Sequence, residues 1–243
     1  MESVRTLRSL SRRAIPPICI LEFDGDLTDW LVQQDLAKPF SSWPCFHTTM
    51  YSVDVGNTTC GLVARTIGGP YAVLIAEQLL AAGARLIVGL TSAGRVAPSL
   101  PLPCIVVASA AVRDEGTSYH YLPPAERVEC PTAMAKYLVS GLQGLNFIVR
   151  EGLVWTTDAP YRETKMQLRH WADRGALAVE MQAASLFAFA TARAANVALV
   201  ARVSNAVGHQ GDQFDTGTQE DGLRVIEAIV QAGEQFLCAS GAA

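Results

Sequence analysis

The chain of 243 residues is poor in charge and in aromatic side chains, which make up 17% and 7% of it, and it contains no long apolar segment. A membrane-spanning helix needs roughly 18–20 apolar residues, and the nearest approach, 183–201, is interrupted by Arg193. The formal net charge of −4 comes with no cluster of Lys or Arg that would bind a phosphate backbone. We therefore expect neither a membrane nor a nucleic acid as a partner.

Paired cysteine motifs are absent as well. The six cysteines lie far apart, without a C-x-x-C pair, and the four histidines show no metal-ligand spacing. This pattern favours reduced thiols in a cytoplasmic protein over a disulfide framework. We expect no metal and no cofactor.

Apolar runs alternate with helical patterns along the rest of the chain, which is half hydrophobic. Alternating strands and helices favour an α/β fold, and we predict a single-domain three-layer sandwich with a central mixed sheet flanked by helices. Residues 1–15, with four arginines, are expected to form an N-terminal arm, and residues 16–243 the domain. The expected strands are Ile18–Phe23, Gly61–Thr66, Ala84–Leu90, Cys104–Val112 and Ala198–Ser204, and the expected helices are Tyr71–Gly83, Ala133–Leu142, Tyr161–Arg174, Glu180–Asn196 and Glu220–Cys238.

Three blocks occur in a characteristic order: IVGLTSAGR from Ile87, TDAPYRET from Thr157 and VEMQAA from Val179. The first block ends in T-S-A-G, whose small residues are typical of a turn where backbone approaches a ligand. Together the blocks resemble the nucleoside phosphorylase and nucleosidase family. The resemblance implies cleavage of the N-glycosidic bond of a nucleoside, a small-molecule substrate, and a homo-oligomer, either a dimer or a trimer of dimers.

The phosphate-binding positions depart from that family. The resemblance places the two phosphate-binding arginines at Asp29 and Ile87, and the neighbouring hydroxyl at Leu90. None of these side chains can hold a dianion, because that takes several converging cationic or hydroxyl donors. Water is therefore favoured as acceptor. The alternative is a rearranged anion site in which Arg65, Arg95 or Arg162 replaces the lost donors.

The hydrolytic branch, which cleaves methylthioadenosine and S-adenosylhomocysteine, is the closer comparison. It has a G-S-A-G-G turn where this chain has Thr91–Arg95, and a glutamate where this chain has Asp29. Asp29 is thus the candidate general base that takes a proton from water. An aspartate in the first turn of a helix is an equally good interpretation.

On the sugar side, the resemblance implies that Met181 packs against the ribose and that Gln182 replaces a glutamate that accepts its hydroxyls. The same resemblance brings in Gly69, Thr91 and Ser92 as sugar-binding residues.

On the base side, Ser204 and Asn205 stand where purine-specific members have Ser-Asp, and Asn205 can donate a hydrogen bond but cannot deliver a proton. Pro160 takes the aromatic position, so Tyr161 is expected to stack on the base and Arg162 to reach a base carbonyl.

Three functions remain open at this point: a nucleosidase, a phosphorylase with a rearranged anion site, and an inactive protein that binds a nucleoside or base. The third is kept because an arginine, a glutamate and an aspartate of the family pattern are missing together.

Overall fold

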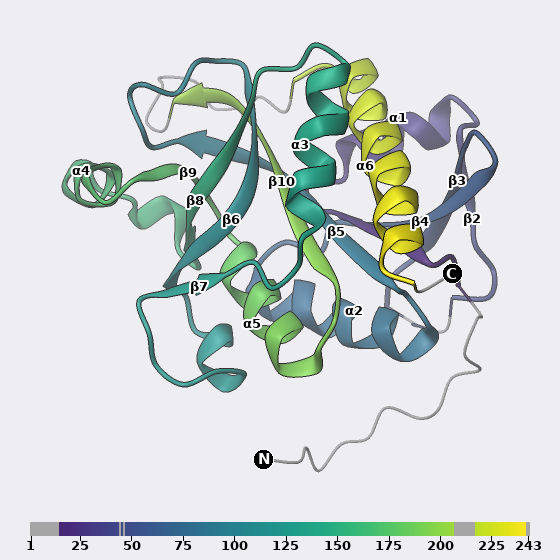
Figure 1. Cartoon of the computed structure of the whole chain (residues 1–243), viewed down its shortest axis with the longest axis horizontal. Coiled ribbons are helices and arrows are strands. Elements are labelled where there is room, and N and C mark those ends of the chain that lie inside the picture. Colours follow the sequence, from purple (N-terminus) through teal and green to yellow (C-terminus); the bar gives the residue numbers. More distant parts are fainter. Residues whose placement is uncertain (1–14, 44, 46, 207–216, 242–243) are drawn as a thin grey trace.

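A ten-stranded mixed sheet with helices on both faces forms the centre of the computed structural model, which describes residues 15–43, 45, 47–206 and 217–241 (Figure 1). This confirms the predicted α/β sandwich. In chain order the elements are β1 (Ile18–Glu22), α1 (Asp26–Gln33), β2 (Ala37–Pro39), β3 (Met50–Val55), β4 (Thr58–Ala64), α2 (Gly69–Ala82), β5 (Leu86–Arg95), β6 (Cys104–Asp114), β7 (Arg127–Glu129), α3 (Met134–Gly144), β8 (Val149–Thr157), α4 (Lys165–Asp173), β9 (Ala176–Glu180), α5 (Ala183–Arg193), β10 (Val197–Ala206) and α6 (Gln219–Ala239).

Part of the sheet closes into a ring of strands that includes β5. The strand order of the sheet is β10-β6-β8-β9-β5-β1-β4-β3-β2, with β7 paired to β6 off this path. Because β10 also pairs with β5, the ring consists of β5, β9, β8, β6 and β10. Strands β1 and β10 both run parallel to β5. Their carboxyl ends therefore meet at one edge of the sheet, which is where α/β proteins usually place a ligand site.

Two large apolar clusters fill the space between the sheet and its helices. Helices α2 and α5 cover one face, where Ile87 and Phe187 are buried, and α1, α3 and α6 cover the other, where Leu90 and Ile229 are buried. A smaller cluster, including Trp155, packs beneath α4. Among the described residues, no helix is long and apolar enough to cross a membrane.

The T-S-A-G segment is not a turn, contrary to the prediction. Strand β5 continues through it to Arg95, because β10 pairs with it on one side and β9 on the other. The small side chains of Ala93 and Gly94 suit a strand enclosed between two neighbours.

The helix expected from Glu180 begins only at Ala183, because Glu180 ends β9 and its carboxylate accepts hydrogen bonds from the N–H groups that start the helix. The helix expected from Tyr161 begins at Lys165, where Thr164 and Gln167 form a capping box. Ile15, expected at the end of the arm, is only 6% exposed, and the rest of the arm lies outside the described residues.

Candidate functional site

The second half of β5 gathers several of the predicted site residues. Ser92 pairs with Arg202 of β10, and Gly94 pairs with Val179 of β9. Because β5 and β9 are antiparallel, the chain beyond Val179 runs back along β5 and brings Met181 toward Ser92. Thr91 is buried, and its hydroxyl donates to the carbonyl of Ser92 at 2.8 Å. Thr91 and Ser92 thus lie in β5 shortly before its end, and Met181 directly follows the strand that pairs with that end.

Ser92 binds a carboxylate of the chain itself. Its backbone N–H donates to Asp24 Oδ2 at 2.8 Å, and its hydroxyl donates to Asp24 Oδ1 at 2.8 Å. Asp24 lies two residues beyond β1, and the parallel register of β1 with β5, which pairs Glu22 with Leu90, brings the two side chains together. Burial raises the pKa of Asp24, and the two hydrogen bonds from Ser92 oppose that rise.

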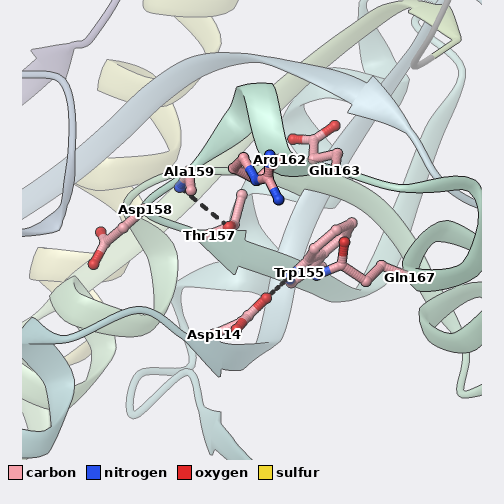
Figure 2. Close-up of a pocket in the computed structure, with 8 residues that line it drawn as sticks. All are labelled: Asp114, Trp155, Thr157, Asp158, Ala159, Arg162, Glu163 and Gln167. Carbon is pink, nitrogen blue, oxygen red and sulfur yellow. Dashed lines mark hydrogen bonds between the residues drawn. The ribbon is translucent and has the colours of Figure 1, made fainter.

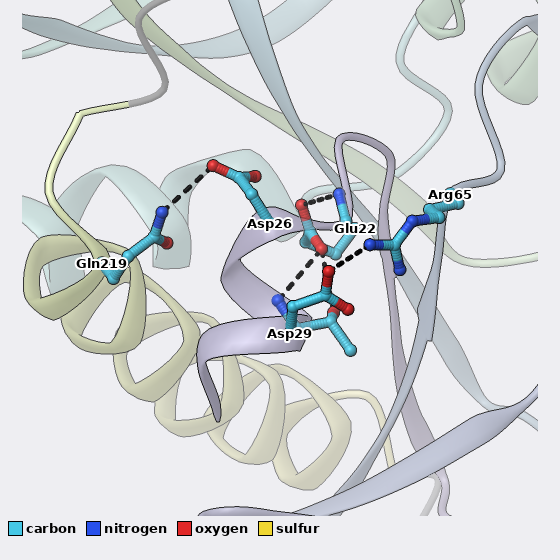
Figure 3. A network of polar contacts seen from close by, with 7 residues as sticks. Glu22, Asp26, Asp29, Arg65 and Gln219 are labelled. Atoms are coloured by element: carbon cyan, nitrogen blue, oxygen red, sulfur yellow. Dashed lines mark hydrogen bonds and ion pairs between the residues drawn. The ribbon is translucent and has the colours of Figure 1, made fainter. Parts of the chain in front are cut away.

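Glu22 anchors the loop that follows β1 (Figure 3). It is 2% exposed, and its carboxylate accepts from Gly25 N at 2.7 Å and from the Thr28 hydroxyl at 2.8 Å. Burial raises the pKa of Glu22 to about 7, against the opposing effect of these hydrogen bonds. Gly25 has a φ of 93°, and a Cβ there would overlap with the side chain of Arg65. The loop therefore requires glycine at this position.

Asp29, the predicted general base, lies in the first turn of α1 and forms an ion pair with Arg65 (Figure 3). Arg65 follows β4 and reaches over the loop. The two side chains are 52% and 56% exposed. Both interpretations of Asp29 thus stay open: it belongs to a helix start, and only one of its carboxylate oxygens is taken by Arg65.

A buried carboxylate holds the Met181–Gln182 segment. Glu180 Oε2 accepts from the N–H of Gln182 at 2.6 Å and from that of Ala183 at 2.8 Å. Its Oε1 accepts from the hydroxyl of Thr156. Burial raises the pKa of Glu180 to about 7, with these hydrogen bonds opposing the rise. Gln182 itself is 2% exposed, and its Oε1 accepts from Met181 N at 3.2 Å. Its acceptor oxygen is therefore turned to the backbone.

Gly69, predicted on the sugar side, is buried at the start of α2 against the side chain of Ser185 in α5. Ser185 in turn donates to Glu115, which also accepts from the N–H of Ser118 at 3.0 Å. In this arrangement Gly69 allows two helices to approach closely.

The predicted base-binding segment borders a small cavity between β8 and α4 (Figure 2). Its volume is about 160 Å³, and Arg162 and Glu163 lie on its rim. Burial raises the pKa of Glu163 to about 7. Tyr161 is 93% exposed and does not line the cavity. The lining residues are Asp114, Trp155, Thr157, Asp158, Ala159, Arg162, Glu163 and Gln167.

A second and more open cavity, of about 550 Å³, shares Asp158 with the first. Its remaining lining comes from α2 and from the segment after β6, and consists of Pro70, Val73, Leu74, Glu77, Gly116, Thr117, His120 and Tyr121.

Ser204 and Asn205 lie in the last part of β10. Ser204 is half-buried. The backbone of Asn205 pairs with Gly94 of β5, and its side chain lies outside the described residues. The pairing puts both residues beside the strand end that carries Ser92.

Three functional candidates were missed at the sequence level: Asp24, Glu22 and Glu180. Two of them had a signal, because an acidic residue inside an apolar run, as in ICILEF and LAVEM, indicates a buried carboxylate. Asp24 had none.

The carboxylates of Glu22, Asp24 and Asp26 come within 4.8 Å of one another, as a metal site would require. They are already engaged by protein donors, since Gln219 donates to Asp26 at 3.0 Å and Arg202 interacts electrostatically with Asp26 and Asp24. We assign no metal to them.

Comparison with known proteins identifies the family. The chain is 28% identical to a uridine phosphorylase of Haemophilus influenzae over 187 residues, which are 70% of this chain and 73% of that protein. It is 32% identical to a guanosine phosphorylase of Halorubrum lacusprofundi over 129 residues, about half of each chain (51% and 52%). It is 25% identical to a DeoD-type purine nucleoside phosphorylase of Exiguobacterium sibiricum over 143 residues (57% and 60%). Residues 17–238 match the family model of the phosphorylase superfamily, and the chain belongs to that family.

Proposed function

We propose that this protein cleaves the N-glycosidic bond of a nucleoside. Family membership and the names of the relatives support the reaction class. The position of the site is supported by Ser92 in β5, by Ser204 on the paired strand β10 and by Met181 directly after the paired strand β9. Cleavage of this bond passes through a sugar with positive charge, so carboxylates near the site, such as Asp24 and Asp29, favour it electrostatically.

Water is the acceptor that the geometry favours, and one observation carries this choice. Ile87 and Leu90, at two of the expected phosphate-binding positions, are 1% and 2% exposed and belong to different core clusters on opposite faces of the sheet. They cannot offer a donor to a ligand. At the third position Asp29 would accept the proton of the attacking water.

Phosphate is the second candidate acceptor, because the relatives are named phosphorylases. The comparisons give no support to the preference for hydrolysis. Arg65, placed beside Asp29, brings a guanidinium to the position where the family has an arginine.

The remaining roles are proposed from the resemblance and from position. Met181 packs against the sugar, and Gln182, Thr91 and Gly69 are the other residues that the resemblance assigns to the sugar side. On the base side Arg162 donates to a carbonyl, with Pro160, Tyr161 and Ser204 around it. Asn205 donates a hydrogen bond to the leaving base.

The deciding experiment is a release assay over a panel of purine and pyrimidine nucleosides, each with and without inorganic phosphate, resolved by chromatography. Free sugar at a rate independent of phosphate is the expected result. Sugar 1-phosphate that forms only when phosphate is present would establish the second candidate. Binding of nucleosides without any turnover would identify the chain as a binding protein.

We further propose a homo-oligomer, a dimer or a trimer of dimers, and a cytoplasmic location. Light scattering during size-exclusion chromatography tests the first. The widely spaced, unpaired cysteines support the second.

A further inference from the structure

The Asp24–Ser92 contact has the geometry of an oxyanion site whose occupant is part of the chain. A backbone N–H and a hydroxyl, both of Ser92, each donate at 2.8 Å to a different oxygen of the same carboxylate. Paired donors of this kind bind carboxylate and phosphate oxygens alike, because both present two oxygens with negative charge. An inorganic oxyanion that uses Ser92 must therefore replace Asp24.

The surrounding loop fixes Asp24 in this position. Glu22 accepts from Gly25 N at 2.7 Å and from the Thr28 hydroxyl, so the residues on the far side of Asp24 are held to the buried end of β1. Gly25 adopts a left-handed conformation that only glycine tolerates here, with Arg65 packed across it. The carboxylate of Asp24 is thus delivered to Ser92 by a constrained loop.

Charge near this position also disfavours a free anion. The carboxylates of Glu22 and Asp26 lie within 4.8 Å of that of Asp24. A dianion in place of Asp24 would bring further negative charge against them, and Arg202 is the cation that balances the group. A tethered carboxylate has a further advantage, since its effective concentration at Ser92 is in the millimolar range or above.

We propose that Asp24 permanently occupies the oxyanion position formed by Ser92 and thereby selects water over an inorganic oxyanion as the acceptor of the reaction. The choice of acceptor rests on the proposed function. The occupancy of Ser92 does not, because it concerns binding alone. Asp24 is a specificity-determining residue in this account: it forms no bond to the substrate and removes the donors that a phosphate would need.

The test is a calorimetric titration of inorganic phosphate into the full chain, the parent and three variants. Asp24→Ala removes the carboxylate that accepts from the N–H and the hydroxyl of Ser92. Asp35→Asn is the control, because it removes one negative charge just beyond α1 from a side chain that is 87% exposed, while Asn tolerates the left-handed backbone there. The double variant Asp24→Ala/Ser92→Ala removes the hydroxyl donor as well. Circular dichroism melts verify that each variant is folded, and Asp24→Ser replaces Asp24→Ala if the latter does not fold.

We expect no phosphate binding by the parent, at least tenfold tighter binding by Asp24→Ala, and a loss of most of this gain in the double variant. Asp35→Asn should change binding by less than about threefold, as expected for a screened surface charge. Parent protein that binds phosphate as tightly as Asp24→Ala, or equal gains in Asp24→Ala and Asp35→Asn, would overturn the proposal. So would a folded Asp24→Ala that gains nothing. These outcomes need no turnover, so they stand whether or not the parent cleaves a nucleoside.

Discussion

Replacement of Glu180 should be the most damaging single change near the site. In Glu180→Ala the N–H groups of Gln182 and Ala183 and the hydroxyl of Thr156 lose their acceptor inside the protein. Each unpaired buried donor costs about 1–3 kcal/mol. Relief from burying a carboxylate offsets part of this, so we expect a loss of about 3–5 kcal/mol in the free energy of unfolding.

Glu180→Gln is the matched variant, because it keeps the size of the side chain and one acceptor oxygen. The pH dependence of the free energy of unfolding, compared between the parent and this variant, is the sharper test. Burial raises the pKa of Glu180 from 4.5 to about 7, so the folded parent binds more protons than the unfolded chain between these values. Glu180 must then lower the stability of the parent as the pH rises through that window, and Glu180→Gln lacks this contribution.

Urea titrations of the parent and both variants at pH 5 and pH 8 measure these free energies. The stability of the parent relative to Glu180→Gln should fall from pH 5 to pH 8, by on the order of a few kcal/mol. A loss below about 1 kcal/mol in Glu180→Ala would refute the account of Glu180 as a buried cap. A parent that gains on Glu180→Gln as the pH rises would refute the raised pKa, because the hydrogen bonds to the carboxylate would then outweigh its burial.

Three further predictions concern other parts of the site. Gly69→Ala should lower stability by about 1–3 kcal/mol in thermal melts, because its Cβ would overlap with Ser185 Oγ. In a Ser185→Ala background, which removes Oγ and keeps a helix former in α5, the same change should cost clearly less, and an undiminished cost would contradict this packing. Asp29→Asn should lower turnover about 10²–10⁴-fold while stability changes by less than ~1 kcal/mol, since its ion pair is half exposed; a rate within about threefold of the parent would exclude Asp29 as the base. Glu163 lines the small cavity beside Arg162, and burial raises its pKa to about 7. If the base binds there, Glu163 donates a hydrogen bond to it below that pH, so KM should rise from about pH 6 to pH 8 in the parent and stay flat in Glu163→Gln; equal profiles would exclude a contact between Glu163 and the base.

The apolar runs predicted the fold correctly, because a buried strand can be recognised from its own apolar residues. Ile87 was expected inside a buried strand and is 1% exposed in β5. Segments whose neighbours decide their conformation were harder to predict. The small residues from Thr91 to Gly94 were interpreted as a turn, although two flanking strands hold them extended. Nothing within the segment itself distinguishes these two outcomes.

The site was harder still, because its contacts join distant parts of the chain. Asp24 and Ser92 are 68 residues apart in sequence, and they meet only through the parallel register of β1 and β5. The family resemblance places Asp29 at an arginine position. Arg65 lies beside it because β4, which Arg65 follows, pairs with β1. In both cases the missing information was the pairing of strands.

These two contacts bear differently on the choice of acceptor. The ion pair of Asp29 with Arg65 is half exposed, and such pairs contribute about 0–1 kcal/mol, so an incoming anion could take Arg65 from Asp29 at little cost. The donors of Ser92 are held by a carboxylate that a constrained loop keeps in place. An anion that recruits Arg65 alone would still lack the two donors of Ser92. In the proposed account, Asp24 at Ser92 therefore adds a second obstacle to phosphate, beyond the loss of donors at Ile87 and Leu90.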